Sequence, residues 1–98
     1  MVIRMLEEVK GALRVTTDAP GIISEIENLI EACKLDLKIS GVSESKVNDY
    51  SDPLIKRSII IYCKANFGFD NEEAERLDRS YVMLKQHLSL AGDYNAVE

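Results

Sequence analysis

The chain has 98 residues, of which 46% are hydrophobic and 30% are charged, and its formal net charge is −5. This length excludes two independently folded domains and this composition excludes extensive disorder, so we expect a single domain over residues 1–98. The excess of acidic residues also disfavours general binding to phosphate backbones or anionic lipid, unless basic residues cluster locally.

The first predicted helix covers residues 3–13, where Leu6, Val9 and Leu13 recur at helical spacing. The segment TTDAPG (16–21) then interrupts the pattern. We expect Asp18 to cap the next helix, with Pro20 in its first turn.

The second predicted helix carries two apolar surfaces. Its main stripe consists of Ile22, Ile26, Leu29, Ile30, Cys33 and Leu37 and should face a core. Its charged residues Glu25, Glu31, Lys34 and Lys38 lie mainly away from that stripe. A separate strip of Ala32, Leu35 and Ile39 exceeds what one buried face requires, which indicates a partner.

Residues 41–51, GVSESKVNDYS, are polar and lack apolar periodicity, so we expect a long loop between the second and third helices. Asp52 followed by Pro53 predicts the start of the third helix, and Gly68 predicts its end. This helix is apolar on several sides. Ile55, Ile59, Tyr62 and Cys63 share one side, Leu54, Ile61 and Ala65 a second, and Ile60 and Phe67 a third. Such a helix is central or is shared between subunits.

The fourth predicted helix begins at Asp70, with Glu73 completing a capping box, and ends at Gly92. A heptad-like seam runs along it, formed by Ala74, Leu77, Tyr81, Leu84, Leu88 and Ala91. Residues 93–98 have little apolar content, and we expect a tail that frays or docks on a neighbour. The predicted fold is therefore an all-α bundle of four helices with a long loop between helices two and three.

The surplus apolar residues of helices two and three define a candidate subunit interface. It consists of Ala32, Leu35, Ile39, Leu54, Ile61 and Ala65. One small core cannot use all of these side chains, so we expect copies of the chain to associate through them.

The order of four segments resembles the small head-tail connector proteins of tailed bacteriophages and prophages, also labelled DNA-packaging proteins. The segments are EEVKGALRV (7–15), IENLIEAC (26–33), DPLIKRSIIIYCKANFG (52–68) and SYVMLKQHL (80–88). The resemblance spans residues 5–94 and implies an all-helical subunit that assembles as an oligomeric ring beneath the portal protein. It further implies that DNA passes through the ring without sequence-specific binding, and that the ring also contacts the next tail-side component. The shortened C-terminal segment GDYNAVE leaves that last contact open.

We expect no catalytic residues, no cofactor and no metal site. Cys33 and Cys63 belong to apolar stripes, which predicts buried, unreactive thiols in a reducing compartment. His87 has no further ligand at suitable spacing on its face of the helix. The acidic group Glu72, Glu73 and Glu75 is explained by its position at a helix start.

Two alternatives to a connector stay open, a small DNA-binding regulator and a helical adaptor for one host protein. A regulator could use a basic strip of Lys56, Arg57, Lys64, Arg76 and Arg79, but a solvated helix face is the favoured explanation of these residues. Glu7 and Glu8 stand where a signal peptide needs apolar residues, and the longest apolar run covers only 59–63. We therefore expect no export and no membrane span. The resemblance to connector proteins implies a virion component assembled in the bacterial host cytoplasm.

Overall fold

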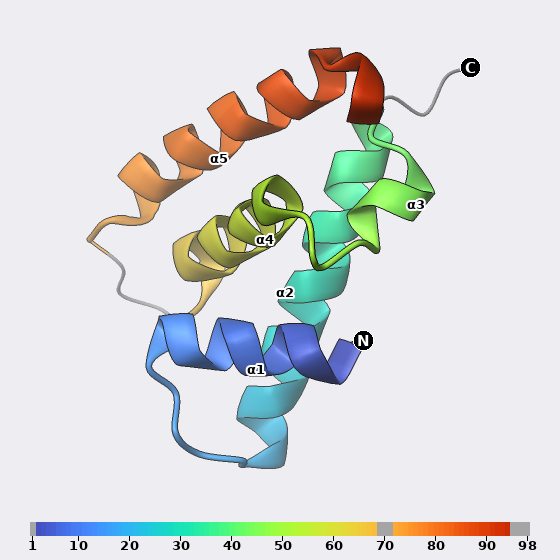
Figure 1. The fold of residues 1–98 in the computed structure, drawn as a ribbon. Helices are drawn as coiled ribbons and strands as arrows, with labels where there is room; N and C mark the ends of the chain where they lie inside the picture. The colour runs from blue at the N-terminus through green and yellow to red at the C-terminus, as the bar shows by residue number, and fades with distance from the viewer. Residues whose placement is uncertain (1, 69–71, 95–98) are drawn as a thin grey trace.

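The computed structural model describes residues 2–68 and 72–94, and over these residues it contains helices and no strand. The helices are α1 (Val2–Leu13), α2 (Pro20–Ile39), α3 (Glu44–Val47), α4 (Pro53–Asn66) and α5 (Ala74–Leu90), followed by a short 3-10 turn, η1 (Gly92–Tyr94). The all-α prediction is confirmed. The described residues hold five α-helices instead of four, because α3 lies inside the segment predicted as a loop (Figure 1).

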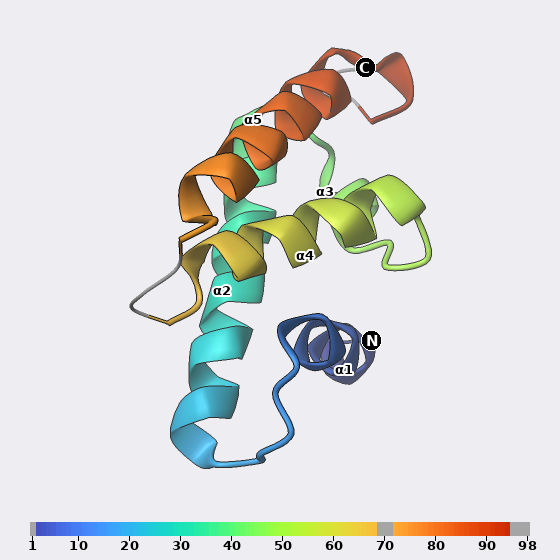
Figure 2. The ribbon, with the colours of Figure 1, turned by 90° about the vertical axis from the view of Figure 1, so that its left-hand side faces the viewer.

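The longest helix, α2, forms a spine along which the other long helices are arranged. Figures 1 and 2 show α1 crossing its lower half, α4 its middle and α5 its upper half. The central position belongs to α4, which contacts α1, α2 and α5. A helix packed on three sides must be apolar around most of its circumference, as the sequence of α4 is.

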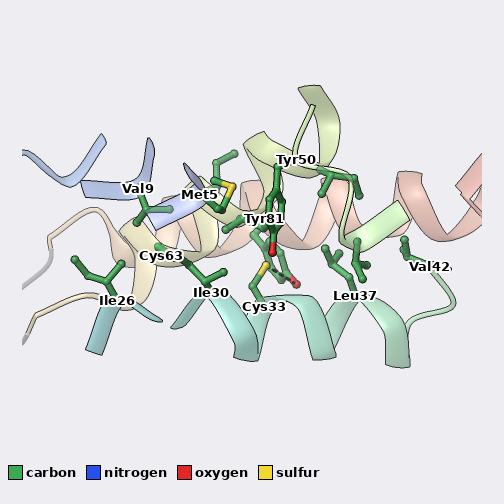
Figure 3. Packing of buried hydrophobic residues seen from close by; sticks show 14 of the residues in the cluster. Met5, Val9, Ile26, Ile30, Cys33, Leu37, Val42, Tyr50, Cys63 and Tyr81 are labelled. Atoms are coloured by element: carbon green, nitrogen blue, oxygen red, sulfur yellow. Dashed lines mark hydrogen bonds between the residues drawn. The ribbon is translucent and has the colours of Figure 1, made fainter. Parts of the chain in front are cut away.

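The core lies between α2 and α4 and is closed by α1 and α5. From the predicted stripe on α2, Ile26, Ile30, Cys33 and Leu37 are completely buried, whereas Ile22 and Leu29 are half-buried. Figure 3 shows members of this stripe facing Val9, Cys63 and Tyr81 from the other helices. The middle of the predicted seam on α5 packs on the core, since Leu77, Tyr81 and Leu88 are buried in the same cluster and Leu84 is partly buried against it. Ala91, the last predicted member, lies just beyond the end of α5.

Two helix ends follow the sequence signals closely. Asp52 caps α4 by accepting hydrogen bonds from the backbone N–H of Leu54 (2.9 Å) and Ile55 (3.3 Å). At the end of α2, Gly41 adopts a left-handed φ of 111°, and the N–H of Val42 donates to the carbonyl of Leu37 at 3.0 Å. Val42 and Leu37 are both buried, so this turn directs the chain back towards the core.

Two predicted caps are not as expected. Ala19 precedes α2 without a side-chain cap, and Asp18 instead forms an ion pair with Lys10 of α1. An ammonium group is a stronger partner for a carboxylate than a neutral backbone amide, and this pair ties the α1–α2 connection to α1. The predicted cap Asp70 lies outside the described residues, and the helix assigned to it begins at Ala74.

The segment predicted as a loop is folded and anchored. Ser43 caps α3 by accepting a hydrogen bond from the N–H of Lys46 at 3.3 Å. Val42, Val47 and Tyr50 are buried in the main core. The prediction of a polar loop was wrong because these three side chains are five and three residues apart, which gives no sustained helical or strand pattern, although each reaches the core.

Candidate assembly surfaces

An apolar strip on α2 faces away from the core. It consists of Ala32, Leu35 and Ile39, and we call it the α2 strip. Leu35 is 55% exposed and Ile39 is 76% exposed, while Ala32 is also exposed. Leu35 follows the buried Cys33 by two helical positions, about 200° around the helix, so it points away from α4. Half of the predicted interface is therefore exposed on the isolated subunit.

The other predicted interface residues, on α4, have a different environment. Ile61 is only 7% exposed and belongs to the core, while Leu54 and Ala65 are half-buried against it. These residues share the face of α4 that is covered largely within the subunit. The six predicted residues thus do not form one continuous exposed surface.

A groove between α4 and α5 provides an apolar surface that the sequence analysis missed. We call it the α4–α5 groove. It has a volume of about 330 Å³ and is lined by Arg57, Ile61, Ser80, Met83, Leu84 and His87. Met83 is 70% exposed, and Leu90, further along α5, is 85% exposed. The sequence offers one sign of this groove, because Met83 is an apolar residue of α5 that lies outside the heptad-like seam.

A second groove adjoins the α2 strip and is bounded by α3. It has a volume of about 380 Å³, and its lining includes Leu35, Val47 and the charged residues Glu31, Lys34 and Lys38. Lys34 was predicted to lie away from the core but is 9% exposed. Its aliphatic stem is buried while its ammonium donates to the hydroxyl of Tyr50 at 2.7 Å, which a helical wheel does not foresee.

A partly buried polar network links α5 to α2. The hydroxyl of Tyr81 donates to Asp36 at 2.7 Å, and Lys85 donates to the same carboxylate oxygen at 2.9 Å. Partial burial favours the neutral carboxyl of Asp36, but the hydrogen bonds from Lys85 and Tyr81 outweigh it and lower its pKa. Desolvation raises the pKa of Tyr81, so its hydroxyl stays a proton donor. The network sets how α5 sits on α2.

The C-terminal turn is held by a second polar cluster. The hydroxyl of Tyr94 donates to the carboxylate of Asp52 at 2.8 Å, and the N–H of Ser43 donates to the carbonyl of Tyr94 at 2.8 Å. Lys46 lies 4.9 Å from the centre of the Tyr94 ring and 3.6 Å from Asp52. Within the predicted tail, Tyr94 therefore docks on its own chain and not on a neighbour, and residues 95–98 lie outside the described part.

Most members of the basic strip have acidic neighbours in the same chain. Lys56 is 3.6 Å from Glu8, Arg79 is 3.7 Å from Glu75, and Arg76 is paired with Glu73. Arg57 is exposed at the rim of the α4–α5 groove, and no ion pair to it occurs within residues 2–68 and 72–94. Neutralised side chains are poor phosphate ligands, so this arrangement does not favour a DNA-binding face.

The residues considered for chemistry are two buried thiols in the core and one exposed histidine. Cys33 and Cys63 are free and buried, and desolvation raises the pKa of both thiols to about 12. The predicted burial of both thiols is confirmed. His87 is exposed in the α4–α5 groove. In the part of the chain that the structure describes, no three His, Cys, Asp or Glu side chains converge as metal ligands.

The whole helical domain matches a known family. The family model described as phage connector protein matches residues 5–95. The chain belongs to this family of phage connector proteins. Neither a curated protein nor a solved structure matches the chain.

Membership of the phage connector family gives a reason to examine the exposed apolar surfaces of the protein. The family is structural, and its members act as components of the virion, so exposed apolar surface is a candidate for contacts with other virion components. No helix among the described residues is long and apolar enough to cross a membrane. The α2 strip and the α4–α5 groove are accordingly the candidate contact surfaces of this connector protein.

Proposed function

We propose that this connector protein is the ring-forming subunit at the head-tail junction. Copies of the chain associate into a closed ring beneath the portal protein, and the ring receives the next tail-side component. DNA passes through its centre without sequence-specific contacts. Assembly takes place in the host cytoplasm, before the tail is joined.

The observation that carries this proposal is the α2 strip on a chain that belongs to the connector family. Leu35 and Ile39 expose more than half of their surface in the isolated subunit, although the core is complete without them. Covering such apolar surface stabilises an assembly by roughly 25 cal/mol for each Å² removed from water. In a closed ring, the α2 strip of every copy is covered by a neighbouring copy.

The charge distribution supports a channel that does not grip DNA. The chain carries 17 acidic and 12 basic residues. Lys56, Arg76 and Arg79 of the basic strip form ion pairs within the subunit. A lining that bound phosphates tightly would slow the passage of the duplex.

Electron microscopy of particles made without the protein tests this function. We expect heads that fill with DNA but fail to retain it and fail to join tails. Normal tailed, infectious particles in its absence would contradict the proposal. A one-to-one complex with a host protein, detected by light scattering, would favour the adaptor alternative.

A further inference from the structure

We infer that the contact between neighbouring copies is head-to-tail, with the α2 strip of one copy seated on the α4–α5 groove of the next. This inference rests on the proposed ring and assigns its two interacting surfaces. It requires that the surfaces differ, point in opposite directions and match in shape and charge.

The two surfaces are on opposite sides of the molecule. The buried side of α2 faces α4, so the α2 strip is on the far side of α2 from α4. The α4–α5 groove is on the outer side of α4, since Arg57 and Met83 at its rim are exposed. In Figure 2, α4 and α5 cross in front of α2, which separates the two surfaces by the thickness of the domain.

Two different surfaces on opposite sides of a subunit allow copies to add one after another. When the patch used on one copy differs from that used on its neighbour, each copy keeps one free surface and addition continues until a ring closes. If instead the α2 strip paired with itself, two copies would satisfy each other and the assembly would stop at a dimer.

The apolar parts of the two surfaces are complementary in form. The α2 strip is a ridge of aliphatic side chains, with Leu35 and Ile39 separated by one helical turn. The α4–α5 groove is a concave surface whose floor contains Ile61 and Leu84 and whose edge is Met83. Methionine adapts to the shape of an inserted side chain, which suits it to the edge of a contact surface.

One exposed charge beside each surface allows an ion pair between neighbouring copies. The border of the α2 strip carries both signs, since Lys34 and Lys38 lie there with Glu31. Glu31 lies one turn before Leu35, its side chain is 60% exposed, and it contacts Lys34 at 3.4 Å. By contrast, α4 carries three basic residues and no acidic one. Arg57 at the rim of the groove has no carboxylate of its own subunit paired to it in the described residues, so Glu31 of the neighbouring copy supplies one.

Mixing two assembly-defective variants tests this arrangement. Leu35→Asp disables the α2 strip but keeps the groove, and Met83→Asp disables the groove but keeps the strip. Both positions are exposed, so both variants should keep the circular dichroism spectrum of the unaltered protein. Each variant alone should have the mass of one chain by light scattering, while the equimolar mixture should shift to two chains and no further. The matched control is a mixture of the Leu35→Asp and Ile39→Asp variants. Both substitutions disable the α2 strip, so neither variant offers an intact strip and the mixture should keep the mass of one chain.

Cysteine cross-linking measures the same contact without relying on loss of assembly. A bismaleimide should link Leu35→Cys chains to Met83→Cys chains in a mixture, and neither variant to itself. The unaltered protein should give no product, since Cys33 and Cys63 are buried.

Three results would overturn the inference. They are efficient linkage of Leu35→Cys to itself, normal assembly of both aspartate variants, and failure of the mixture to pair when the unaltered protein forms larger species. Each of these would leave the connector function standing, because that function is tested separately by the morphology of particles made without the protein.

Discussion

Leu35 and Ile59 are both aliphatic residues of amphipathic helices, yet their environments differ completely. Ile59 is fully buried between α4 and its neighbours, whereas Leu35 is 55% exposed. We expect Ile59→Asp to unfold the subunit, because an unpaired buried carboxylate costs several kcal/mol out of a total stability of roughly 5–15 kcal/mol. Leu35→Asp should change the urea midpoint only slightly and should impair association. Equal loss of stability in the two variants would show that Leu35 belongs to the core.

Asp36 and Asp52 make stability depend on acid pH. In each case burial opposes ionisation, but hydrogen bonds, chiefly from Lys85 and Tyr94 respectively, outweigh it and lower the pKa below the ordinary value of 3.8. A carboxyl group whose pKa is lower in the folded state than in the unfolded state stabilises the fold at pH values above 3.8. This stabilisation is lost as the pH falls through the pKa of the folded state.

The predicted effect is measurable with Asp36→Asn. The variant should be less stable than the unaltered protein at pH 7, and the difference should shrink as the pH falls below about 4. Urea unfolding at several pH values measures this. Asp93→Asn is the control, because Asp93 is exposed and is not part of the Asp36 network. A difference that stays constant from pH 7 to about pH 2 would contradict the account.

At the scale of elements, the sequence predicted best where local signals and burial agree. The start of α4 was predictable because Asp52 and Pro53 act through adjacent backbone groups. The helix α3 was not, because its burial depends on Val47 and Tyr50 reaching a core built by distant segments. The role of Asp18 was misassigned for a similar reason, since Lys10 lies eight residues away in sequence.

The same principle explains the candidate surfaces. The α2 strip was predictable because α2 has two apolar faces and the core of the subunit covers only one of them. The α4–α5 groove depends on how α5 lies on α4, and its residues are far apart in sequence. Arg57 lies in α4 and Met83 in α5, so the periodicity of a single helix cannot show that both line one groove.

The contact of η1 with the segment around α3 gives a prediction about local opening. Tyr94→Phe removes the hydrogen bond to Asp52, and we expect loss of about 1 kcal/mol in the docking of η1. The amide of Ser43, which donates to Tyr94, should then exchange hydrogen roughly fivefold faster. Tyr62→Phe is a matched control, since no hydroxyl hydrogen bond of Tyr62 occurs in the described residues. Unchanged exchange at Ser43 in Tyr94→Phe would show that the backbone contact alone holds η1.

At the scale of the whole molecule, net charge and ion pairing predict weak binding to free DNA. A net charge of −5 repels the duplex, and Lys56, Arg76 and Arg79 are paired within the subunit. In a gel-shift assay at about 0.15 M salt, where screening acts beyond about 8 Å, we expect no sequence-specific complex. Sequence-specific binding at nanomolar concentration would favour the regulator alternative.

Cryo-electron microscopy of the neck of mature particles tests the central claim most directly. We expect a closed ring of copies of this chain on the tail side of the portal, with the α2 strip of each copy against the α4–α5 groove of the next. Particles whose neck is complete and contains no copy of the chain would contradict the account.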